Sequence, residues 1–131
     1  MYLVSTCRPD IAFVTAQSSK YMQNPRQIHL DVALRVIRYL RTTENQGIQF
    51  NRIDESNDKN SVPKSNMVAY CDASFQLDPD TERSVYGNLS IFYGSAVTWS
   101  SQIGKSIPLS TTEAELMSAV EQIKALIFNV D

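Results

Sequence analysis

Cysteine, histidine and long apolar runs are scarce in this 131-residue chain, and each scarcity excludes a class of protein. Two cysteines, Cys7 and Cys71, are too few for a disulfide framework and lack the spacing of a metal site, so we expect small buried thiols in a reducing compartment. The single histidine, His29, makes a histidine-based zinc site or a Ser-His-Asp triad very hard to assemble. No apolar stretch approaches the ~20 residues of a membrane span, so no membrane partner is expected.

The composition is that of a globular protein, but its charge is divided unevenly. Hydrophobic residues make up 43% and charged residues 20% of the chain. Residues 1–52 carry seven basic and three acidic side chains, whereas residues 53–131 carry five and eleven. This asymmetry predicts two pieces with different tasks. Residues 54–66 contain Val62 as their single aliphatic residue, which predicts a linker.

Two helices are predicted before the linker. Pro9 opens a segment that runs to Met22, because proline suits the first turn of a helix, and Asn24-Pro25 predicts a break. A second helix is expected over residues 27–43, and its apolar residues share one arc: Val32, Ala33, Val36, Ile37 and Leu40. The opposite side carries a basic row that consists of Arg35, Arg38 and Arg41. This row is either a solvated face or a contact for nucleic-acid phosphates.

After the linker the hydrophobic pattern changes to the period of two that is typical of strands. Strands are predicted over residues 67–72, 84–93 and 96–101, with a tight turn at 93–95. A final helix opens at Ser110, and its buried stripe is predicted to consist of Leu116, Ala119, Val120, Ile123 and Ile127. The expected fold class is therefore α+β: two helices, then three antiparallel strands and a helix.

Two acidic residues stand out by their positions. Asp72 ends an apolar strand and Glu115 lies in the first turns of the final helix, so the pair could share one Mg²⁺. Alternatively, Asp72 caps the following loop and Glu115 is a surface charge. Glu113 points away from Glu115, and Ser110 with Glu113 fits a capping box, which gives Glu113 a structural task at the helix start.

Ordered motifs in both pieces resemble Copia-type (Ty1/copia) retrotransposon Pol polyproteins. In the second piece the stretches that carry the resemblance to the ribonuclease H domain are Asp72-Ala73, Arg83-Ser84-Val85-Tyr86-Gly87, Trp99-Ser100-Ser101 and Leu109 through Glu115. In the first piece the stretches that resemble the end of the adjoining reverse transcriptase are Arg8-Pro9-Asp10-Ile11-Ala12, Asn24-Pro25, His29 and Arg38-Tyr39-Leu40.

This resemblance implies an organisation and a chemistry. Residues 1–52 would be the helical, thumb- or connection-like tail of a reverse transcriptase, residues 53–66 the linker, and residues 67–131 a truncated ribonuclease H-like domain. Such domains cleave RNA in RNA–DNA hybrids with two Mg²⁺ or Mn²⁺ ions about 4 Å apart. Asp72 would bridge both ions and Glu115 would be the helix ligand. The implied partners are the hybrid and the remainder of the Pol polyprotein, in cytoplasmic particles or in the nucleus.

The departures from the family pattern predict little activity for this chain alone. The family's third acid precedes Asn-Gln after the first helix, whereas Asp131 is the last residue here and does not match it. Two acids are too few to hold two dications, so catalysis would need a continuation of the polypeptide or a partner that supplies the missing strands. In the full fold the Asp72 strand would pair with a later strand, and here that edge would be open. The alternative is a non-catalytic module that binds nucleic acid or protein.

Overall fold

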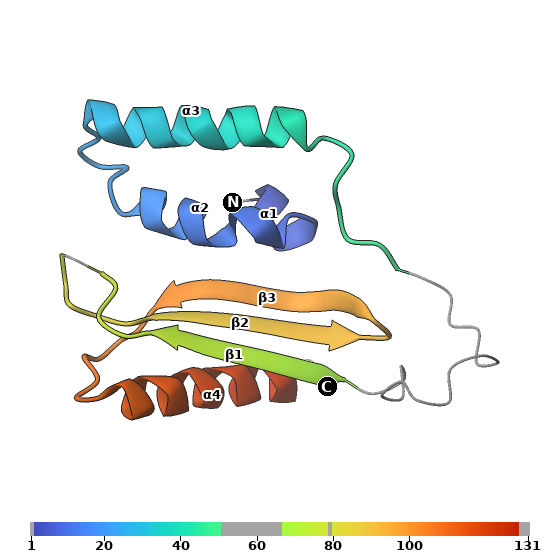
Figure 1. The fold of residues 1–131 in the computed structure, drawn as a ribbon, viewed down its shortest axis with the longest axis vertical. Helices are drawn as coiled ribbons and strands as arrows, with labels where there is room; N and C mark the ends of the chain where they lie inside the picture. The colour runs from blue at the N-terminus through green and yellow to red at the C-terminus, as the bar shows by residue number, and fades with distance from the viewer. Residues whose placement is uncertain (1, 51–66, 79, 129–131) are drawn as a thin grey trace. The chain divides into compact units, whose positions relative to one another are not determined.

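The computed structural model describes residues 2–50, 67–78 and 80–128, so the predicted linker lies outside the described residues. The chain divides into two compact units, Met1–Ile48 and Gln49–Asp131. Helices make up the first unit, and three antiparallel strands followed by a helix make up the second, as Figure 1 shows. The predicted α+β class is thereby confirmed. No helix among the described residues combines the length and apolar character that a membrane crossing requires.

The first unit contains more, and shorter, helices than the sequence predicts. The expected helix from Pro9 to Met22 is a short 3₁₀ turn followed by an α-helix that ends at Ser19, and an additional helix precedes it. The elements are α1 (Tyr2–Thr6), η1 (Pro9–Ile11), α2 (Ala12–Ser19) and α3 (Gln27–Thr42).

The apolar arc predicted for α3 is only partly covered. Val32, Val36 and Leu40 are half-buried, but Ala33 is exposed and Ile37 is 61% exposed. The reason is the short partner, because the eight residues of α2 can cover only a narrow stripe of the sixteen-residue α3.

The second unit is built on a sheet in the order β1-β2-β3. Its strands are β1 (Val68–Ser74), β2 (Val85–Phe92) and β3 (Ser95–Ile103). Tyr93 and Gly94 connect β2 to β3, with φ angles of 51° and 74°. Two successive left-handed residues make the tight hairpin turn that suits the twist of antiparallel strands, and glycine adopts it without steric cost.

Helix α4 (Thr111–Phe128) packs on β1 and β2, but the predicted buried stripe is wrong. Leu116, Ile123 and Ile127 are each more than half exposed. The residues of α4 that are buried are Ala114, Ser118 and Gln122.

Hydrogen bonds and small size explain why these residues of α4 face the sheet. Ser118 Oγ donates to the carbonyl oxygen of Asp72 at 2.8 Å, and Gln122 Nε2 donates to Ser90 Oγ at 2.7 Å. Small side chains let the helix approach the strands closely, and the hydrogen bonds satisfy polar groups that burial would otherwise penalise.

The cysteine prediction is also wrong in one part. Cys71 is an exposed free thiol on β1, and Cys7 is half-buried and free. Cys71 is exposed because β1, at the edge of the three-stranded sheet, is exposed along most of its length.

Candidate functional site

Asp72 lies on β1 with its side chain on the sheet face away from α4. On β2, Tyr86 and Ser90 contact α4, because Tyr86 Oη donates to Met117 Sδ at 3.2 Å and Ser90 accepts from Gln122. Successive residues of a strand face opposite sides of the sheet, so Gly87, next to Tyr86, faces away from α4. Asp72 pairs with Gly87, and because cross-strand partners share a face, Asp72 also faces away from α4. Asp72 is exposed and has no side chain beside it at Gly87, so its carboxylate is open to a ligand.

Glu115 lies on the flank of α4 that is nearest the outer edge of β1. Ser118 is directed at β1. Because successive residues of a helix are rotated by 100°, Met117 and Glu121 lie on the flank of α4 toward β3, and Glu115 lies on the opposite flank. Glu115 is exposed and precedes Ser118 by about one turn. Glu115 therefore lies on the α4 side of the sheet, whereas the Asp72 side chain lies on the other face.

The described residues do not assemble a complete metal site. Among them, no group of three or more His, Cys, Asp or Glu side chains is close enough to hold an ion. An ion shared by Asp72 and Glu115 would have to sit at the β1 edge and take further ligands from elsewhere. Their role as metal ligands stays a prediction.

The cap of α4 has the expected residues and one unexpected partner. The Glu113 N–H donates to Ser110 Oγ at 3.1 Å, as in a capping box. The Glu113 carboxylate accepts from the N–H of Leu109 at 2.6 Å, rather than from that of Ser110. Glu113 is therefore engaged at the helix start, which leaves Glu115 as the available acid in this turn.

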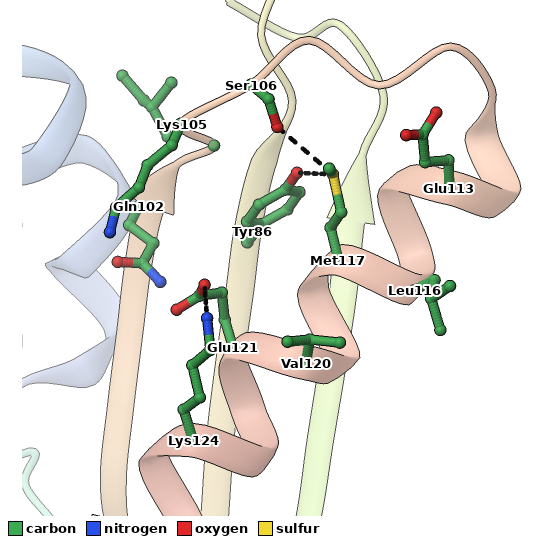
Figure 2. A pocket seen from close by; sticks show the side chains of 12 residues that line it. Tyr86, Gln102, Lys105, Ser106, Glu113, Leu116, Met117, Val120, Glu121 and Lys124 are labelled. Atoms are coloured by element: carbon green, nitrogen blue, oxygen red, sulfur yellow. Dashed lines mark hydrogen bonds and ion pairs between the residues drawn. The ribbon is translucent and has the colours of Figure 1, made fainter.

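A pocket on the other flank of α4 was not predicted. Figure 2 shows it between α4 and the segment that follows β3, with a volume of about 410 Å³. Its apolar wall includes Tyr86, Leu116 and Met117. Burial, followed by the charges of Glu113 and Glu121, raises the pKa of the Tyr86 hydroxyl. Neither Asp72 nor Glu115 lines this pocket, so it is separate from the β1 edge.

The family-like residues of the first unit form a polar cluster. Arg8 is 6% exposed. Its guanidinium donates to both carboxylate oxygens of Asp10 at 2.7–3.2 Å and to the carbonyl and hydroxyl oxygens of Thr43 at 2.9 and 2.7 Å. Tyr39 Oη donates to Asp10 Oδ2 at 2.8 Å. The Arg8 hydrogen bonds, with help from Tyr39, lower the pKa of the Asp10 carboxyl to about 2. This cluster ties the N-terminal segment to the end of α3.

His29 also has a structural role. Its Nδ1 accepts a hydrogen bond from the Arg26 N–H at 3.0 Å, at the start of α3, and its ring stacks on Tyr21 with a centroid distance of 4.1 Å. Two family-like positions of the first unit, Arg8 and His29, thus hold its helices in place.

The basic row of α3 is exposed. Arg35, Arg38 and Arg41 all lie at the surface, and no hydrogen bond or ion pair engages them within the described residues. The row is therefore available for phosphates, although nothing in its geometry selects a particular nucleic acid.

Comparison with known proteins gives matches over nearly the whole chain. Neither a protein-family model nor a solved structure matches. The putative transposon Ty5-1 protein of Saccharomyces cerevisiae is 35% identical over 124 residues, which cover 94% of this chain and 37% of that protein. The Pol polyprotein from transposon TNT 1-94 of Nicotiana tabacum is 34% identical over 128 residues, 98% of this chain and 9% of that protein.

A third relative is of similar size to this chain. The secreted RxLR effector protein 161 of Plasmopara viticola is 32% identical over 121 residues, which cover 92% of this chain and 79% of that protein. By contrast, the chain spans little more than a third of the Ty5-1 protein and less than a tenth of the TNT 1-94 polyprotein.

Proposed function

Because this chain belongs to the copia-type retrotransposon Pol family, we propose that residues 67–131 are the first part of a ribonuclease H domain and residues 1–52 the end of a reverse transcriptase. One observation carries the proposal. In the element order β1-β2-β3-α4, Asp72 is exposed on β1 and Glu115, 43 positions later in sequence, is exposed on α4, the helix that packs on β1.

The proposed substrate is the RNA strand of an RNA–DNA hybrid, and the proposed cofactor is Mg²⁺ or Mn²⁺. Carboxylate oxygens suit these hard cations, and the substrate phosphate usually completes the coordination shell. Asp72 and Glu115 would supply two of the protein ligands. Since the described residues offer no third ligand nearby, we propose that the isolated chain binds the ions too weakly to cleave and that further Pol polypeptide completes the site.

A hybrid-cleavage assay tests this proposal. The chain is compared with a chimaera that adds the polypeptide following the matched region in the TNT 1-94 protein. We expect no cleavage by the chain alone, Mg²⁺-dependent cleavage by the chimaera, and loss of that cleavage in Asp72→Asn and Glu115→Gln. The control is Glu82→Gln, which changes an exposed loop acid and should leave cleavage unchanged. A chimaera that cleaves equally well with Asp72→Asn would refute the assignment.

The exposed basic row favours a second candidate function, binding of nucleic acid without catalysis. Three arginines that no described residue engages can neutralise phosphates, and such binding weakens steeply as salt rises. Replacing Arg35, Arg38 and Arg41 by glutamine should then reduce the salt dependence of binding to a labelled hybrid. Binding that is indifferent to these substitutions would exclude the row as the contact.

A further inference from the structure

The pocket on the β3 side of α4 is built by the second unit. Its lining residues come from β2, from β3 and the segment after it, and from α4 (Figure 2). Strands that extend the sheet are expected beside β1, on the opposite flank of α4, so this pocket is not where further Pol polypeptide would complete the sheet. Its volume of about 410 Å³ suits a two-ring organic molecule, since an apolar cavity of ~150 Å³ holds benzene.

Two hydroxyl groups in this pocket donate to a weak acceptor. Tyr86 Oη donates to Met117 Sδ at 3.2 Å, and Ser106 Oγ donates to the same sulfur at 3.8 Å, as the dashed lines in Figure 2 show. A thioether sulfur accepts hydrogen bonds only weakly. Tyr86 is 4% exposed, so water offers its hydroxyl little compensation. An oxygen acceptor that entered the pocket would therefore receive a stronger hydrogen bond from Tyr86 than the sulfur does.

The charges of the pocket favour an uncharged ligand. Two lysines, Lys105 and Lys124, and two glutamates, Glu113 and Glu121, line it, so their charges sum to zero. An ion would lose hydration on entering without an overall attraction to repay that loss. Burial, followed by the charges of Glu113 and Glu121, raises the pKa of the Tyr86 hydroxyl, so this group stays protonated and remains a donor.

We propose that this pocket binds an uncharged, largely apolar molecule whose carbonyl oxygen accepts the hydrogen bond of Tyr86 Oη in place of Met117 Sδ. The apolar part of the molecule contacts the wall that includes Ile103, Met117 and Val120. The unbranched methionine side chain can adjust to such a ligand, because it has three rotatable bonds. The site is separate from Asp72 and Glu115, so its test does not depend on the proposed nuclease activity.

A pair of similar ligands tests the proposal on the unmodified chain. Tetralone and tetralin share a two-ring skeleton, but only tetralone carries a carbonyl oxygen. In a titration followed by NMR of the methionine methyl groups, we expect tetralone to shift the Met117 signal saturably. The signal of Met67, an exposed residue outside the pocket, should not move. Tetralone should bind roughly 2- to 10-fold more tightly than tetralin, the effect of one neutral hydrogen bond. Equal affinities, or no saturable shift of Met117, would overturn the proposal.

The variant Tyr86→Phe identifies the donor, because it keeps the ring and removes the hydroxyl. In this variant the preference for tetralone over tetralin should disappear. The control is Tyr93→Phe, which changes a 46% exposed tyrosine outside the pocket and should keep the preference. Circular dichroism checks that both variants are folded, and a folded Tyr86→Phe that retains the preference would overturn the assignment. The anionic analogue tetralin carboxylate should bind the unmodified chain more weakly than tetralone, and tighter binding would overturn the choice of an uncharged ligand.

Discussion

Replacing Arg8 with alanine should loosen the first unit while leaving the second intact. Arg8 is nearly buried and makes hydrogen bonds to both Asp10 and Thr43, so it links the start of the chain to the end of α3. Ile11 is the sole hydrophobic residue that is buried in the described part of this unit. With so small a core, the polar cluster around Arg8 must contribute much of the stability of the unit.

The expected loss is about 2–3 kcal/mol, because hydrogen bonds to charged groups contribute ~1.5–3 kcal/mol and their removal leaves partners unsatisfied. The loss is not larger, because a third of the Asp10 side chain is exposed and water can replace part of the interaction. In hydrogen exchange, this free energy corresponds to roughly 30- to 150-fold faster exchange of the α3 amides.

Hydrogen exchange followed by mass spectrometry measures each unit separately. In Arg8→Ala, peptides from α3 should exchange faster, while peptides from β2 and α4 should be unchanged. The control is Arg38→Ala, which removes an exposed arginine that no described residue engages and should change stability by less than ~0.5 kcal/mol. If Arg8→Ala and Arg38→Ala exchange alike, the cluster does not hold the unit together.

The pH dependence gives a second measurement of the same cluster. Its carboxyl, Asp10, has a pKa of about 2 in the folded chain, lowered from 3.8. A depressed folded pKa means that the stabilisation is fully present above pH 3.8 and is lost as the pH falls through 2. The effect is on the order of 1–2 kcal/mol, nearer the lower value because Asp10 is partly exposed. Protection of α3 should therefore decrease between pH 4 and pH 2, and Asp10→Asn should lack that decrease.

Three further predictions concern the second unit. Gly104→Ala should destabilise it by ~1–3 kcal/mol in urea denaturation, since the new Cβ would lie 2.9 Å from Tyr86 Oη. Gly87→Ala, in the same unit, meets no atom within 4 Å and serves as the control. Ser118→Ala should cost about 1 kcal/mol by loss of the bond to Asp72, and an unchanged midpoint would contradict the proposed anchoring of α4. Tyr86 should ionise above the ordinary tyrosine pKa, so Tyr86→Phe should remove a late component from an ultraviolet titration; an unaltered titration curve would contradict its burial.

Sequence patterns predicted most of the second unit because its strands alternate regularly and its turn chemistry is explicit. The Tyr93-Gly94 turn and the Ser110 cap are local features, determined by backbone preferences over a few residues. The buried face of α4 could not be predicted in this way. Periodicity identifies the apolar side of a helix, but here the contacts to Asp72 and Ser90 orient the polar side toward the sheet. These contacts join residues more than 30 positions apart in sequence.

The candidate site was predicted only as far as its residues. Their positions and the family resemblance singled out Asp72 and Glu115, and their role as metal ligands stays a prediction. Strand alternation places Asp72 on the face away from α4. Only the pairing register of β1 with β2 reveals that face, because a shift of one residue would reverse it. The polar cluster of Arg8, Asp10 and Tyr39 was visible as family-like motifs, yet its structural role depends on contacts across 29 to 35 positions.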